Sequence, residues 1–165
     1  ILYKAEAMNP YDWMNQTGHS IGQSYGLKSD GLYDTIEELT ARPYNTYTSN
    51  KQQLTKGNSM TLTLKGYKGK KITGITLSMK SNVSGGSGYL SVMAGTTALA
   101  SIGSSNSGVA FNDAQWHGSY STSYVDVNVT INDKTHIIGT NEDVTITIGA
   151  TVNSLFCQSF TITYE

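Results

Sequence analysis

The sequence is poor in charged residues. Only 14% of its 165 residues are Asp, Glu, Lys or Arg, against about a quarter in an ordinary soluble domain. The 11 basic and 12 acidic residues nearly cancel, leaving a formal net charge of -1. Because so balanced a chain creates no long-range electrostatic field, nucleic acids and anionic membrane surfaces are not expected as partners.

Cysteine and long apolar runs are also scarce. Cys157 is the single cysteine, so no intrachain disulfide can form, and its neighbours Leu155, Phe156 and Phe160 predict a buried, inert thiol. No apolar run approaches the roughly 20 residues that a membrane-spanning helix needs, so no membrane span is expected.

The chain starts at Ile1 rather than Met. This start fits either removal of an export signal or a trimmed chain, and we expect an extracellular or cell-surface location.

Proline is nearly absent, with 2 residues, while 17 Gly and 11 Tyr accompany abundant Ser, Thr and Asn. This composition is typical of strands joined by tight turns, and the aromatic residues supply area for a core. The length is usual for one domain, and no change in composition marks a linker. We therefore expect a single domain over residues 1–165.

Apolar residues alternate with polar ones from about residue 57 onward, which is the pattern of strands with one buried face. The segments 60–64 and 75–79 predict an antiparallel hairpin, and 90–94 with 99–102 predict a second. Residues 125–131 show the strictest alternation, with Val125, Val127, Val129 and Ile131 on one side. Further strands are expected at 144–148 and at 156–164, and the last should carry Phe156, Phe160, Ile162 and Tyr164 on one face. Together these segments predict an all-β fold, a two-sheet antiparallel sandwich.

The first 56 residues are less regular. A strand is expected at 2–7, and Asp34 with Glu37 three residues later resembles a helix capping box. Pro43 would stop such a helix. The pattern favours one short helix near residues 34–41, with a strand as the alternative.

Residues 60–165 resemble a known class of module. The resemblance rests on KITGITLSMKSN at 71–82, GGSG at 85–88, FNDAQWHG at 111–118 and NSLFCQSFTITY at 153–164. These segments are similar to exported jelly-roll sandwich modules of gut Bacteroidetes, which look like galactose-binding-like domains and often have no assigned function. The resemblance implies a jelly-roll sandwich that works outside the cytoplasm.

Aromatic residues in polar segments are the best signal of a binding site. An exposed Trp or Tyr can stack on the apolar face of a sugar while amides bond its hydroxyls. The candidate ligand-binding residues lie in two segments: Gln115, Trp116, His117 and Tyr120, and then Tyr11 with Trp13. The alternative is that each Trp closes one end of the core. Exposure of the two Trp side chains decides between these readings.

Patterns for catalysis, metals and cofactors are missing. His19, His117 and His136 have no metal-ligand spacing, and no strained nucleophile motif is present. Asp30, Asp34, Glu37 and Glu38 are close in sequence, but this favours a solvated face over a pair of catalytic carboxyls. We therefore expect no catalytic residue, no metal site and no cofactor.

Three functions stay open at this point. The first is a non-catalytic exported binding module, with carbohydrate bound through loop aromatics as the candidate activity. The second is a structural or adhesive cell-surface domain that contacts other proteins through sheet edges or a flat apolar patch. The third is an enzyme that acts on polysaccharide, which would require a cleft with facing carboxyls.

Overall fold

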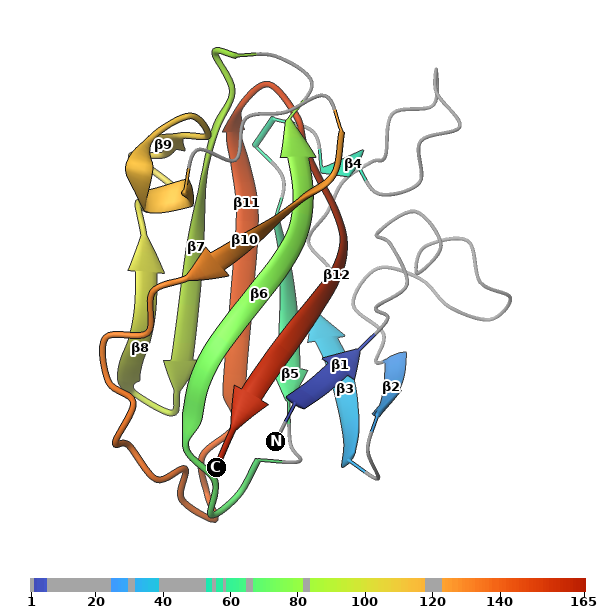
Figure 1. Ribbon diagram of the computed structural model, residues 1–165, viewed down its shortest axis with the longest axis vertical. Helices are drawn as coiled ribbons and strands as arrows, with labels where there is room; N and C mark the ends of the chain where they lie inside the picture. Colours follow the sequence, from blue (N-terminus) through green and yellow to red (C-terminus); the bar gives the residue numbers. More distant parts are fainter. Residues whose placement is uncertain are drawn as a thin grey trace.

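The fold is a sandwich of two antiparallel sheets, seen in a computed structural model (Figure 1). The structure describes residues 2–5, 25–29, 32–38, 53–54, 56–57, 59–64, 67–81, 84–117 and 123–165. In the figure, β6 (Ile72–Ser81) and β12 (Leu155–Tyr164) pass in front of β11 (Val144–Val152), which belongs to the other sheet. The predicted all-β, two-sheet antiparallel sandwich is thereby confirmed.

The five-stranded sheet, counted over the described residues, has the order β1-β12-β6-β10, with β4 also paired to β12. The long strands β6 and β12 form its centre, and β10 pairs with β6 at one edge. The remaining members of this sheet are β1 (Leu2–Ala5), β4 (Gln53–Leu54) and β10 (Val125–Val129).

The seven-stranded sheet has the order β2-β3-β5-β11-β7-β8 over the same described residues, and β9 pairs with β7. Strand β11 lies between β5 and β7 and pairs with both along most of its length. Its other members are β2 (Tyr25–Ser29), β3 (Leu32–Glu38), β5 (Ser59–Leu64), β7 (Ser87–Ala94), β8 (Thr97–Ile102) and β9 (Val109–Ala110).

The core lies between the two sheets and follows the alternation in the sequence. Strand β6 buries Ile75, Leu77 and Met79, each at most 2% exposed. The facing strands β7 and β11 bury Leu90, Val92, Ala94, Val144, Ile146 and Ile148. Because side chains of successive strand residues point to opposite faces, the Thr and Ser residues between them point away from the core.

The predicted hairpin of residues 60–64 with 75–79 is wrong. Strand β5 pairs with β11 and β3, whereas β6 pairs with β12 and β10 in the other sheet. The alternation fixes which side of each strand is buried but leaves its partner open. The second hairpin is confirmed, since β7 and β8 pair directly across a turn at Gly95.

The short helix predicted near 34–41 is also wrong over the part that the structure describes. Residues Leu32–Glu38 form β3, which pairs with β2 from Leu32 to Ile36 and with β5 at Thr35 and Glu38. A capping box is a local signal, and a helix of two turns is marginal without tertiary support. Pairing with two neighbouring strands therefore prevails.

The last strand does not present all its aromatic residues on one face. Its pairing with β6 shifts between Cys157 and Ser159. Phe156 consequently lies opposite Lys80 on the outer side, where the Lys80 ammonium is 5.0 Å from the centre of its ring. Because of the bulge, Phe156 and Ile162 point to opposite faces of the sheet, and Ile162 is the one in the core.

The part of the chain that the structure describes contains no helix with the length and apolar character of a membrane span.

The facing of β10 gives a direct test of the core. Val127 is 1% exposed and points between the sheets, so Val127→Asp buries a charge without a partner. We expect a loss of about 4 kcal/mol or more of unfolding free energy, measured by thermal melting followed by circular dichroism. The control Asp126→Ala changes an exposed neighbour and should alter stability by about 0.5 kcal/mol at most. A Val127→Asp protein that melts within a few degrees of the wild type would contradict this placement.

Candidate functional site

Trp116 is a core residue. It ends the 3-10 helix η1 (Ala114–Trp116), and its side chain is 0% exposed. Its indole Nε1 donates a hydrogen bond to the carbonyl of Val109 at 3.1 Å, and its ring meets Phe111 edge-on at 5.3 Å. Trp116 therefore has no exposed face on which a sugar could stack, and it leaves the set of candidate ligand-binding residues.

The neighbours of Trp116 do reach the surface. Asp113 caps η1 by accepting a hydrogen bond from the backbone N–H of Gln115 at 2.9 Å. This turn directs Gln115 and His117 outward, and His117 adopts the left-handed backbone conformation with φ of 54°. Of the other candidates, Tyr11, Trp13 and Tyr120 lie outside the described residues.

Gln115 lines a depression at the edge of the seven-stranded sheet formed by β8. The described residues around it come from the end of β8, from η1 and from the segment that leaves β10: Ser101, Ile102, Gln115, Thr130 and Asn132. The volume of the depression is about 250 Å³. The backbone N–H of Asn132 donates to the carbonyl of Leu99 at 2.8 Å, which holds this segment against β8.

The lining combines hydroxyl and amide side chains. Ser101, Gln115, Thr130 and Asn132 are exposed, whereas Ile102 is buried and contributes an apolar portion. Hydroxyls and amides both donate and accept hydrogen bonds, which is the property needed to bind another hydroxyl. None of these described lining residues is charged at neutral pH, so their polar contacts are hydrogen bonds between neutral groups.

Three of these residues were not found from the sequence. Ser101, Thr130 and Asn132 belong to common residue types and lie in segments that show only strand or turn character. The depression exists because the chain after β10 crosses to β8, and this crossing has no local sequence signal. Gln115 was a candidate because it precedes Trp116 in a polar loop, although Trp116 itself does not line the depression.

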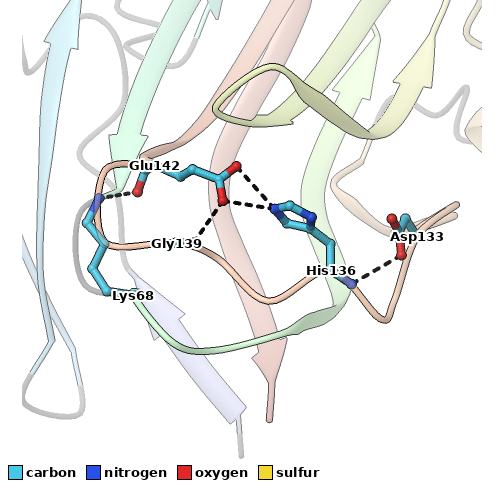
Figure 2. Close-up of polar contacts among 5 residues, drawn as sticks. All are labelled: Lys68, Asp133, His136, Gly139 and Glu142. Atoms are coloured by element: carbon cyan, nitrogen blue, oxygen red, sulfur yellow. Dashed lines mark hydrogen bonds and ion pairs between the residues drawn. The ribbon is translucent and has the colours of Figure 1, made fainter.

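A second cluster of polar residues lies at the other end of the sandwich, where the loop 131–143 meets the turn 67–71 (Figure 2). The imidazole Nε2 of His136 is 3.2 Å from both carboxylate oxygens of Glu142. The backbone N–H of Gly139 donates to Glu142 Oε1 at 2.8 Å. Lys68 donates to the backbone carbonyl of Glu142 and lies 2.7 Å from the carboxylate of Asp143.

Asp133 shapes the beginning of the same loop. Its Oδ1 accepts the backbone N–H and the hydroxyl of Thr135 at 3.0 and 2.9 Å, and the backbone N–H of His136 at 3.1 Å. The bond from the Thr135 hydroxyl, followed by those from the backbone, lowers the pKa of Asp133. These contacts fix the turn that directs His136 toward Glu142.

The contacts of Glu142 hold its carboxyl in the ionised form. The Gly139 N–H bond, then the hydrogen bond and charge of His136, lower the pKa of Glu142. Glu142 is therefore not suited to donate a proton near neutral pH, which needs a carboxyl with a raised pKa. Among the described residues, no three His, Cys, Asp or Glu side chains gather closely enough to hold a metal ion.

Comparison with known proteins identifies no relative of this chain among the protein families and curated sequences searched. No family model matches the chain, and a search of curated proteins finds no significantly similar sequence. The likeness to galactose-binding-like modules stays a prediction from the sequence.

The contacts of Glu142 predict a pH-dependent stability. Its folded pKa is lower than the unfolded value of about 4.3, so its stabilisation is present above that value and is lost as pH falls through the folded pKa. Glu142→Gln removes the charge but keeps an oxygen acceptor for Gly139. We expect this variant to melt below the wild type at pH 7 and to approach it in thermal melts as pH falls through the folded pKa.

The matched control is Asp126→Asn, which removes a carboxylate from the exposed face of β10. It should follow the wild-type melting temperature more closely at every pH. A deficit of Glu142→Gln that did not shrink as the pH was lowered, or that was absent at pH 7, would contradict the role given to Glu142.

Proposed function

We propose that this domain is a non-catalytic binding module that recognises a hydroxyl-rich ligand, with a sugar as the candidate, outside the cell. The observation that carries the proposal is the depression at the edge of β8. Exposed hydroxyl and amide side chains of Ser101, Gln115, Thr130 and Asn132 surround it. A neutral sugar offers a matching set of donors and acceptors, and it needs no ionic partner.

The size of the depression favours a single sugar unit. Pockets for drug-sized ligands are about 300–1,000 Å³, and this depression has about 250 Å³. A hexose has about 12 non-hydrogen atoms, and at about 0.3 kcal/mol for each the binding free energy is about 4 kcal/mol. This corresponds to a Kd of about 1 mM, which is weak but measurable.

The adhesive alternative has less support from the described residues. The edge of β8 has a bulge at Leu99, and the Leu99 carbonyl already accepts a hydrogen bond from the backbone N–H of Asn132. Both features hinder pairing of β8 with a strand of another protein. Among the residues whose exposure the structure describes, the exposed large apolar side chains are Ile137, from loop 131–143, and Val152, at the end of β11. In Figure 1, β11 ends at the top of the sandwich, whereas loop 131–143 runs from the end of β10 down to the bottom, where β11 begins.

The proposal is tested by titrating glucose, galactose, mannose and xylose against the protein in ligand-observed NMR. At least one should bind with a Kd of about 1 mM to 10 mM. Gln115→Ala should weaken that binding about fivefold, because it removes one or two hydrogen bonds to the sugar. It should leave the melting temperature unchanged because the Gln115 side chain is exposed.

The matched control is Asn141→Ala, which removes an exposed amide from the loop at the other end of the sandwich. It should bind as the wild type does. Absence of binding for all four sugars and for their oligomers, or equal losses in both variants, would refute the proposed site.

A further inference from the structure

The seven-stranded sheet has an uncharged part, which borders β3 where Glu38 is opposite Thr61. Its neighbouring strands β5, β11, β7 and β8 contain no Asp, Glu, Lys, Arg or His. Exposed sheet faces and edge strands usually carry charged side chains, especially Lys, which hinder association. An uncharged face four strands wide is suited to a neutral partner.

A row of hydroxyls crosses this face. Thr61 on β5 is opposite Thr147 on β11, with their hydroxyl oxygens 3.0 Å apart. Thr147 is opposite Ser91 on β7, and Ser91 is opposite Ser101 on β8. The row therefore ends at Ser101, which lines the depression. With neighbouring strands about 4.8 Å apart, its three steps span about 14 Å, which is longer than one sugar ring.

Tyr89 lies flat beside this row. It is opposite Gly149 on β11, and a Cβ atom on Gly149 would be 2.5 Å from Cε1, 2.7 Å from Cζ and 2.8 Å from the hydroxyl oxygen of Tyr89. The ring thus covers the glycine instead of projecting from the sheet. Gly149 is buried beneath it, while Tyr89 is partly exposed, so the ring keeps an outward surface.

We infer that the binding surface extends from the depression along the row of Ser101, Ser91, Thr147 and Thr61 to Tyr89, and that its occupant is an uncharged oligosaccharide. The inference rests on the proposed function, because the depression supplies the first subsite. The Tyr89 ring supplies a surface for the apolar face of a sugar, and the row supplies bonds to its hydroxyls. The absence of charge on the four strands favours neutral over acidic chains.

The experiment compares hexasaccharides with monosaccharides by isothermal titration calorimetry. Its probes are cellohexaose, xylohexaose, mannohexaose and maltohexaose, with an oligogalacturonate as the acidic counterpart. At least one neutral hexasaccharide should bind about tenfold more tightly than its monosaccharide, and the oligogalacturonate should bind more weakly than that hexasaccharide. Tyr89→Ala should remove this tenfold gain and leave monosaccharide affinity unchanged, whereas Tyr89→Phe should retain the gain.

A second variant covers the case in which Tyr89→Ala destabilises the sheet. Thr147→Val keeps a β-branched residue suited to a strand and removes one hydroxyl of the row. It should lower hexasaccharide affinity about fivefold and leave monosaccharide affinity unchanged.

The outcomes separate the two proposals. If a monosaccharide binds but no hexasaccharide binds more tightly, or if neither variant changes the gain, the extension is refuted and the depression remains the site. Tighter binding of the oligogalacturonate refutes the preference for a neutral chain. If no saccharide binds at all, the proposed function fails together with the extension.

Discussion

The alternation of apolar residues with Thr and Ser along the strands is the constraint on which the rest of the structure depends. It buries one face of each sheet in a common core, with side chains such as Leu77 and Ile146 only 1–2% exposed. Threonine is β-branched and favours strands while its hydroxyl stays polar. The same pattern that builds the core therefore also leaves an outer face of hydroxyls on the seven-stranded sheet.

The two ends of the sandwich are closed by different means, and both affect the proposed site. Trp116 and Phe111 close one end by packing against each other, and the turn that buries Trp116 exposes Gln115. At the other end, loop 131–143 is tied down by Glu142 through Gly139 and His136. This loop includes Asn132 near its start, so its attachment helps to hold one wall of the depression in place.

The sequence predicts the facing of strands well and their partners poorly. The burial of Val127 and Val129 follows from period-two alternation alone. The pairing of β5 with β11 does not, because it depends on which apolar faces meet across the core, and the contact of Tyr89 with Gly149 is equally hidden. Gln115 could be proposed from its loop, and a core position is one of two hypotheses for Trp116. Its contacts to Phe111 and the Val109 carbonyl decide for the core.

Amide chemical shifts in protein-observed NMR, followed while the four neutral hexasaccharides are added, test the proposed binding surface most directly. We expect the largest shifts at Ser101, Gln115, Asn132 and Ser91, which lie around the depression and along the adjoining row. Residues of loop 131–143 near Glu142 should shift little. Shifts concentrated near Glu142, or spread evenly over both sheets, would contradict a binding site at the edge of β8.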